Sequence, residues 1–97
     1  SSEADFCLGD GNLGVGTTSP TVPLHLLGSG ATMARIESTD ATRCTLVFKA
    51  NTASEWEIGS RTNGAFYIYN GGYRMYINST GNLGVGTNNP IFKLDVT

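Results

Sequence analysis

The chain is poor in charge and in the side chains that most enzymes use for chemistry. Its 97 residues include six Lys and Arg, eight Asp and Glu, and one histidine, for a formal net charge of -2. No basic stripe is present, so the composition gives little support to nucleic-acid binding. His25 has no nucleophile or carboxylate placed beside it, and a surface position between Leu24 and Leu26 explains it better than catalysis does. We therefore expect no nucleic-acid partner and no catalytic residues.

Cysteines and long apolar runs are also scarce. Cys7 and Cys44 are too few for a disulfide framework, and we expect both to be free thiols. No apolar run approaches the roughly 20 residues that a membrane-spanning helix needs, so no membrane insertion is expected. Asp10-Gly11-Asn12 lacks the remaining ligands of a calcium loop and is better interpreted as a turn. The sequence thus predicts no metal and no cofactor.

Glycine, small polar residues and aromatics are abundant, as is typical of short strands joined by tight turns. Helix signals are weak, and the best of them, residues 31–36, is short. Strand patterns separated by turn clusters occur at residues 35–37, 45–49, 56–58, 65–69 and 73–77. Short strands at about 8–12 residue spacing predict an all-β fold of short antiparallel strands, in a small sandwich or meander.

Asn63-Gly64 and Asn70-Gly71-Gly72 supply the residues that tight hairpin turns require, so residues 56–77 are expected to form a three-stranded meander. The alternation of side chains assigns residues to two faces. One face, taken as the core, carries Trp56, Ile58, Phe66, Ile68, Tyr73, Met75 and Ile77. The other carries Tyr67, Tyr69, Arg74 and Tyr76, which is unusually aromatic for a solvent face.

A block at 11–20, beginning Gly-Asn-Leu-Gly-Val-Gly-Thr and ending in proline, returns at 81–90 without a gap. In both copies apolar residues alternate with glycines, at Leu13, Gly14, Val15 and Gly16 and at Leu83, Gly84, Val85 and Gly86. Glycine inside a strand often marks the close approach of another backbone. Several chains meeting near an axis would explain this strip, with the leucines and valines buried between them.

The repeat divides the chain into three parts. Residues 1–27 form a first joint, residues 28–78 a central β module, and residues 79–97 a second joint. A module bracketed by two copies of one joint is typical of proteins that grow along an axis.

The repeated block, continued by the apolar residues of 24–26 and 94–96, resembles a recurrent segment of phage tail-fibre and tailspike proteins. In that family the segment precedes a C-terminal intramolecular chaperone domain, and similar blocks occur in bacterial surface proteins. Parts of the central module, such as Trp56-x-Ile58-Gly59 and the run from Arg74 to Ile77, are similar to such fibres too. The resemblance implies a β-rich, intertwined homotrimer in a virion or, alternatively, an extracellular or bacterial cell-surface protein. It implies no enzyme.

Three functions follow from these patterns. The first is a non-enzymatic fibre segment that trimerises and spaces or presents a host receptor-binding surface, which would recognise a surface glycan or protein. The second is a carbohydrate-binding module that uses the tyrosine-rich face, although packing of these tyrosines against a neighbouring chain explains them better. The third is a subunit of an extracellular filament or virion decoration. Loops on a rigid scaffold usually carry binding residues, so the expected receptor contacts are Arg61, Asn63, Tyr67 and Tyr69.

Overall fold

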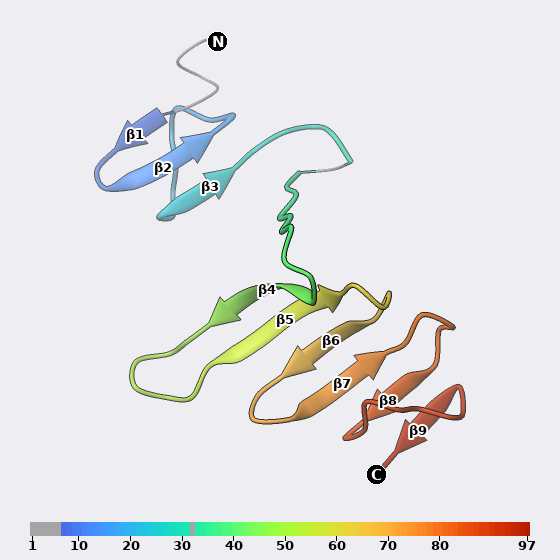
Figure 1. Ribbon diagram of the computed structural model, residues 1–97. Helices are drawn as coiled ribbons and strands as arrows, with labels where there is room; N and C mark the ends of the chain where they lie inside the picture. Colours follow the sequence, from blue (N-terminus) through green and yellow to red (C-terminus); the bar gives the residue numbers. More distant parts are fainter. Residues whose placement is uncertain (1–6, 32) are drawn as a thin grey trace. The chain divides into compact units, whose positions relative to one another are not determined.

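The computed structural model describes residues 7–31 and 33–97, and within these residues it contains strands and no helix (Figure 1). The strands are β1 (Cys7–Gly9), β2 (Asn12–Val15), β3 (Leu24–Leu26), β4 (Arg43–Phe48), β5 (Trp56–Arg61), β6 (Phe66–Tyr69), β7 (Tyr73–Ile77), β8 (Leu83–Val85) and β9 (Leu94–Val96). The all-β prediction is confirmed. The expected strand at 35–37 is wrong, because this segment has no neighbouring strand to complete a ladder.

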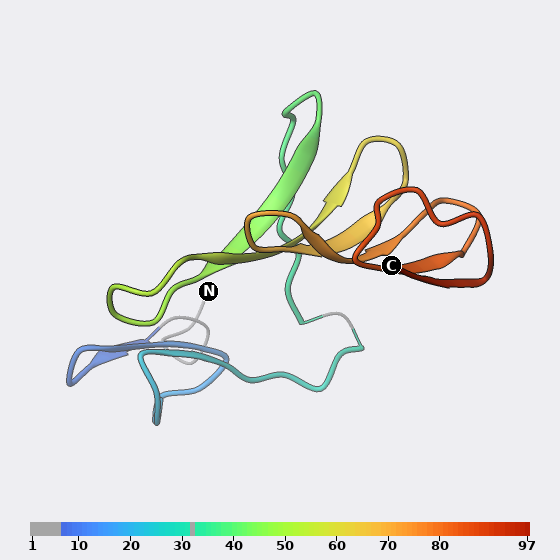
Figure 2. The ribbon, with the colours of Figure 1, turned by 90° about the horizontal axis from the view of Figure 1, so that it is seen from below.

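The strands form two sheets in two compact units. Unit 1, Ser1–Arg35, holds the three-stranded sheet β1-β2-β3, and unit 2, Ile36–Thr97, holds the six-stranded sheet β4-β5-β6-β7-β8-β9. The second joint continues the sheet of the central module, since β8 pairs with β7 from Met75↔Val85 to Ile77↔Leu83. In Figures 1 and 2 the six strands of unit 2 lie side by side in one twisted layer, in which β4 to β8 form a meander and β9 extends the same sheet.

The predicted three-stranded meander is the centre of the larger sheet, as β5, β6 and β7. Its two turns have the expected chemistry, because Gly64 and Gly71 both adopt positive φ, at 90° and 64°. The turns are closed by Gly64 N–H donating to Arg61 O at 3.0 Å and Asn70 N–H donating to Gly72 O at 3.0 Å. The other predicted turn, at Asp10-Gly11, joins β1 to β2 with positive φ at both residues.

A β-bulge alters the predicted distribution of side chains in β7. Ile68 pairs with Met75, but Tyr69 pairs with Tyr73, so Arg74 is an extra residue opposite Tyr69. Because cross-strand partners share a face, the bulge moves Tyr73 to the side of Tyr67 and Tyr69. The prediction that Tyr73 lies with Met75 is therefore wrong, and simple alternation could not foresee the shift.

The structure also reverses which face of the meander is buried. The buried hydrophobic core of the described residues is Ala65, Tyr67 and Tyr76, and Tyr67 is only 1% exposed. Trp56, the expected core aromatic, shares a face with Ile58 as predicted but is 47% exposed. Within unit 2 no second sheet covers that face, whereas the tyrosines of the other face cover one another.

The two joints close with parallel strand pairs, which the antiparallel prediction did not include. β2 pairs with β3 from Leu13↔Leu24 to Val15↔Leu26, and β8 pairs with β9 from Leu83↔Leu94 to Val85↔Val96. The register of the second pair repeats that of the first at equivalent positions of the two blocks. The repeat in sequence is thus a repeat in structure.

Candidate functional site

Each joint consists of a strand, a loop and a second strand that returns parallel to the first. The same hydrogen bonds form within each of the two joints, at equivalent positions. Leu13 N–H donates to Pro23 O at 2.8 Å, and Leu83 N–H donates to Lys93 O at 2.9 Å. The amide of Asn12 donates to Pro20 O, and that of Asn82 donates to Pro90 O, each at 3.3 Å. These bonds anchor the loop at its proline, so the chain can return parallel without a crossover helix.

The alternating glycines are explained by these loops. A methyl group added at Gly14 would lie 2.5 Å from the carbonyl oxygen of Thr17, and one at Gly84 would lie 2.5 Å from that of Thr87. Both glycines are buried. The added methyl group would also lie close to the Cβ atom of a proline, at 3.3 Å from Pro20 in the first joint and 3.4 Å from Pro90 in the second. The close backbone approach predicted at Gly14 and Gly84 therefore occurs within one chain, between a strand and its own loop.

Gly16 and Gly86 complete the joints, because both have positive φ, at 85° and 80°. A methyl group at either would meet the carbonyl of the last residue of its joint, Leu27 or Thr97. The apolar residues that alternate with these glycines, Leu13, Val15, Leu83 and Val85, lie on the face of the strand opposite the glycines. The leucines are half-buried and the valines exposed in the single chain.

His25 and Asp95 occupy equivalent positions in the joints and make the same bond. His25 Nδ1 accepts from Thr21 N–H at 3.1 Å, and Asp95 Oδ2 accepts from Ile91 N–H at 3.0 Å. An acceptor at this position holds the end of the loop against β3 or β9. The only histidine of the chain thus has a structural role in the first joint, which the sequence alone did not indicate.

The second feature is the tyrosine face of unit 2, defined by Tyr67, Tyr69, Tyr73 and Tyr76. The Tyr73 ring is central and meets the other three edge to face, with centroid distances of 5.4 Å to Tyr67, 5.2 Å to Tyr69 and 5.0 Å to Tyr76. This packing depends on the bulge that moved Tyr73. Because the rings face one another's edges, much of their surface is used within the cluster.

Two of the predicted receptor contacts hold this cluster in place. The Arg61 guanidinium donates to the Tyr73 hydroxyl at 2.6 Å, and the Asn63 amide donates to the Tyr76 hydroxyl at 3.1 Å. Asn63 also accepts from Ala65 N–H at 3.0 Å and so shapes the hairpin turn. Arg61 and Asn63 thereby link the turn between β5 and β6 to the rings below it.

Tyr67 is the most deeply buried ring of the cluster. Its hydroxyl is buried and has no hydrogen-bond partner among the residues that the structure describes. Burial, and to a smaller extent the negative charge of Glu57, raises the pKa of the Tyr67 hydroxyl above its ordinary value. Of the four predicted receptor residues, Tyr67 is therefore the one without surface for a partner, and Tyr69 is half-buried.

The third feature is the opposite side of the six-stranded sheet, here called the apolar face. The registers align two rows of side chains that cross all six strands. A further pair of side chains lies beside these rows on β4 and β5 only. The first row is Leu46, Ile58, Ile68, Met75, Val85 and Val96. The second is Cys44, Ser60, Phe66, Ile77, Leu83 and Leu94, and the pair is Phe48 and Trp56.

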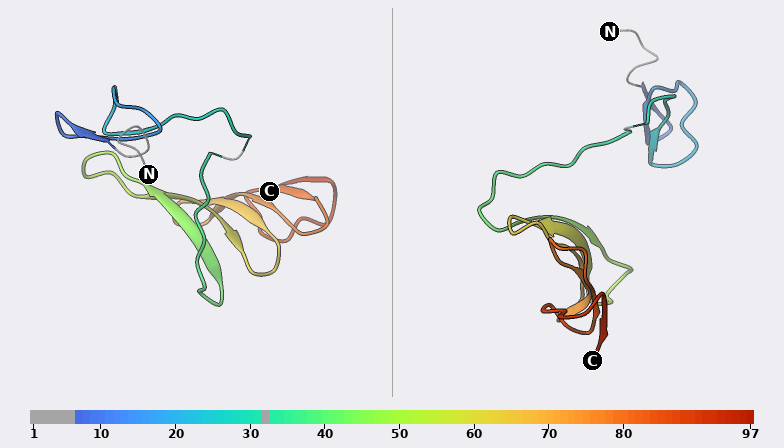
Figure 3. Two further views of the ribbon diagram at one scale, coloured as in Figure 1. Left: turned by 90° about the horizontal axis from the view of Figure 1, so that it is seen from above. Right: turned by 90° about the vertical axis from the view of Figure 1, so that its right-hand side faces the viewer.

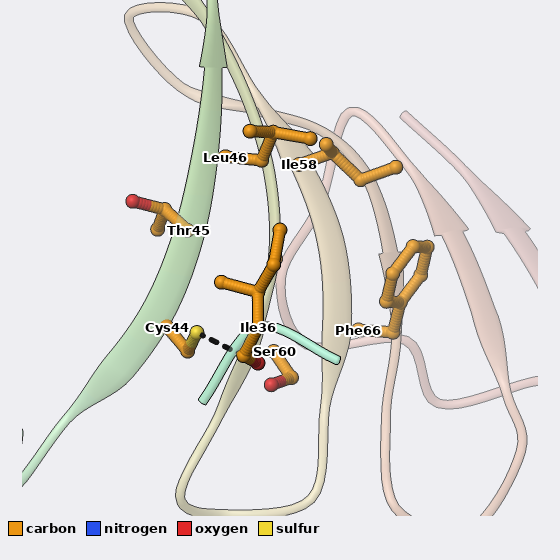
Figure 4. A pocket seen from close by; sticks show the side chains of 8 residues that line it. Ile36, Cys44, Thr45, Leu46, Ile58, Ser60 and Phe66 are labelled. Atoms are coloured by element: carbon orange, nitrogen blue, oxygen red, sulfur yellow. Dashed lines mark hydrogen bonds between the residues drawn. The ribbon is translucent and has the colours of Figure 1, made fainter. Parts of the chain in front are cut away.

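Part of the apolar face forms an open groove of about 310 Å³ near β4 and β5. Figure 4 shows Ile36 beside Cys44 and Ser60, on the side of the sheet that carries Leu46, Ile58 and Phe66. Cys44 is a free thiol, and its Sγ donates to Ile36 O at 3.4 Å. The free-thiol prediction is confirmed for Cys44, while the side chain of Cys7 lies outside the described residues.

Sequence reasoning assigned the strips of the joints and the apolar residues of the meander separately. The structure joins the strip of the second joint and the meander into one surface, because β8 continues the meander, whereas the strip of the first joint lies in the separate sheet of unit 1. Leu46 and Ile36 were missed, although the alternation of residues 44–48 contained the signal for Leu46. Nothing in the sequence pattern indicated that Ile36 would lie on this face.

Other kinds of site find no support in the described part of the chain. Residues 7–31 and 33–97 contain no group of three or more His, Cys, Asp or Glu side chains placed to hold a metal ion. The same residues include no helix long and apolar enough to cross a membrane. No protein-family model matches this chain, and no curated protein matches it. The interaction surfaces must therefore be judged from their own geometry.

Proposed function

We propose that this chain is a non-enzymatic structural segment of a phage tail fibre or tailspike. It trimerises and spaces or presents a surface that binds a host receptor. The observation that carries this proposal is the duplicated joint, whose strand register and loop hydrogen bonds recur at equivalent positions before and after the meander. The same joint before and after a module is typical of a fibre that is built from successive modules.

The small core supports association between chains. Unit 2 extends from Ile36 to Thr97, yet the buried hydrophobic side chains of the described residues are only Ala65, Tyr67 and Tyr76. Small domains are marginally stable even with a complete core, and many gain the missing burial by oligomerisation. A trimer would supply that burial. The proposed location is accordingly the virion, with a bacterial surface or extracellular protein as the alternative.

Receptor contacts are proposed at the turns and outward side of residues 38–76. The turn residues 38–42 and 51–55 are exposed, and Arg61 and Asn63 stand at the hairpin that borders the tyrosine face. Tyr69 completes this surface. Tyr67 supports it from beneath, so its part in recognition would be indirect.

Sedimentation of the purified chain at micromolar concentration tests the assembly. The proposal expects the discrete mass of three chains. A folded monomer would refute it, and a polydisperse polymer would favour the open filament, in which a joint of one copy contacts a different surface of the next.

Adsorption to host cells tests the receptor surface. Fibres with Arg61→Ala, Asn63→Ala and Tyr69→Ala should adsorb less than wild type, provided that trimers form. Tyr67 is retained in this variant so that the buried ring stays in place. Unchanged adsorption would assign the segment to a spacer, and binding of the wild-type chain to a glycan array would favour a carbohydrate-binding module.

A further inference from the structure

We propose that the apolar face of the six-stranded sheet is the surface at which copies of this chain meet. This inference rests on the proposed fibre function and specifies its interface. The glycines of the joints serve the loops of their own chain, so they do not by themselves place a neighbouring chain. The apolar face, in contrast, is not covered by a second sheet of unit 2.

The extent of the face supports the assignment. Both rows cross every strand from β4 to β9, and Leu46, Phe48, Trp56, Phe66, Val85, Leu94 and Val96 are all exposed. Six strands about 4.8 Å apart, with three to six residues each, form a face roughly 24 Å across and roughly 10 to 20 Å along the strands. Apolar patches of several hundred Å² mark association surfaces in soluble proteins.

The charge distribution of the apolar face is compatible with a second copy of the chain as its occupant. Within β4–β9, all of which the structure describes, no Asp, Glu, Lys or Arg stands at a strand position of the apolar face. Of the charged strand residues, Arg43, Glu57, Arg61 and Asp95 belong to the other side of the ladder, and Arg74 is the extra residue of the bulge, whose guanidinium donates to Asn70 O. An identical face can therefore approach without burying an unpaired charge, whose desolvation is costly.

The need for a cover points to the same occupant. A sheet with so small a core would be stabilised by burial of its apolar face. A second copy of the chain can supply this burial, because it is present wherever the chain is made. In the proposed trimer, three such faces would turn inward and supply the common core.

The three-stranded sheet of unit 1 shows the same arrangement independently. Its register places Leu8, Leu13 and Leu24 in one row and Val15 and Leu26 in the next, opposite the face that its loop covers. Four of these five side chains are exposed, and Leu13 is half-buried. In each unit taken by itself, the joint loop therefore packs on the glycine side and no second sheet covers the apolar side.

Neighbouring residues of β4 provide a matched test. Leu46 and Val47 are 44% and 45% exposed, but Leu46 belongs to the apolar face while Val47 pairs with Glu57 on the other side. Leu46→Lys should reduce the sedimenting mass from three chains to one, because a lysine would be buried between copies. Val47→Lys should keep the trimer, since its charge stays in solvent beside Glu57. Trimers from both variants would overturn the interface and leave the fibre proposal standing.

Cysteine labelling keeps the inference testable if Leu46→Lys fails to fold. Leu46→Cys and Val47→Cys, each in a Cys7→Ser and Cys44→Ser background, are treated with iodoacetamide as native trimers. A buried thiol reacts more slowly, so Leu46→Cys should be labelled about tenfold or more slower than Val47→Cys. Equal rates in a confirmed trimer would refute the interface alone, whereas a monomeric wild type would refute the fibre proposal with it.

Discussion

At the scale of single residues, the tyrosine face combines satisfied and unsatisfied hydroxyls in one cluster. The hydroxyls of Tyr73 and Tyr76 accept hydrogen bonds from Arg61 and Asn63, while that of Tyr67 is buried without a described partner. An unpaired buried polar group costs free energy that the same ring without the hydroxyl would not. The three rings should therefore respond differently to the same substitution.

Tyr67→Phe should leave the free energy of unfolding unchanged or raise it by up to about 1 kcal/mol, because it removes an unpaired hydroxyl and keeps the ring. Tyr76→Phe is the matched control and should lower the free energy of unfolding by about 0.5–1.5 kcal/mol, since the bond from Asn63 is lost. Urea unfolding of the two variants measures the difference. A larger loss in Tyr67→Phe than in Tyr76→Phe would contradict the assignment of the hydroxyls.

Alkaline pH should destabilise the protein through Tyr67. Its pKa is higher in the folded chain than the ordinary value of 10.0, mainly because burial disfavours the phenolate. The stability linked to this group is fully present below about pH 10 and is lost as the pH rises through the folded pKa. Thermal melting of wild type and Tyr67→Phe between pH 8 and about 11 should thus diverge above about pH 10. Parallel curves would show that another group causes the alkaline loss.

At the scale of elements, the joint shows why a strand can alternate leucine or valine with glycine. One side of β2 or β8 is occupied by the loop of the same joint, and only a residue without a side chain leaves room for a backbone carbonyl there. The loop in turn brings the next strand back in parallel. The glycines are therefore requirements of the joint as a folded unit, whatever its neighbours are.

Gly84→Ala should lower the free energy of unfolding by about 1–3 kcal/mol, because the added methyl group would press on the Thr87 carbonyl, which cannot move without shifting the loop. Gly72→Ala is the control, since nothing lies within 4 Å of a methyl group there and its φ is not positive. Thermal unfolding of both variants measures the effect. Equal melting temperatures would mean that the loop does not pack on Gly84 as described.

His25 and Asp95 allow a comparison between the two joints. Each accepts a backbone N–H four residues earlier, at the end of the loop. Removing the acceptor leaves that N–H to water, so the two joints should lose a similar, small amount of stability on substitution by alanine. The equivalence also explains how a histidine and an aspartate can occupy one position of a repeat.

At the scale of the whole molecule, few hydrophobic side chains of the described residues are buried in the single chain. The joint loops pack on the glycines of β2 and β8, and the tyrosines of unit 2 pack on one another, but within unit 2 no second sheet lies over the apolar rows. Figure 3 shows the strands of unit 2 as a single curved layer. Association between copies is the proposed source of the missing core.

Trp56 should report that association. It is 47% exposed in the single chain and belongs to the apolar face. In the proposed trimer its fluorescence emission should lie at shorter wavelength than that of tryptophan in water, and Leu46→Lys should shift it to longer wavelength. Val47→Lys should leave the emission unchanged. Emission like that of free tryptophan in a confirmed trimer would place Trp56 outside the interface.

The sequence by itself determined the strands, the turns and the repeat, because these depend on local preferences. Gly64 and Gly71 indicated hairpins, alternation placed Trp56 beside Ile58, and the return of one block without a gap foretold two equivalent joints. Of the candidate site, the sequence identified Arg61, Asn63, Tyr67 and Tyr69 as a group, but it placed Tyr73 on the opposite face. It did not indicate that Arg61 and Asn63 hold the hydroxyls of Tyr73 and Tyr76.

Only the tertiary structure decided which faces are covered. A period of two divides a strand into two sides but does not say which side meets another layer, so Tyr67 and Trp56 exchanged their expected roles. A single bulge at Tyr73 and Arg74 completed the tyrosine cluster, and a loop of the same chain packs on Gly84, where the sequence predicted the close approach of another backbone. Each outcome depends on contacts between distant residues, because burial is a property of the packed layers and not of a strand alone.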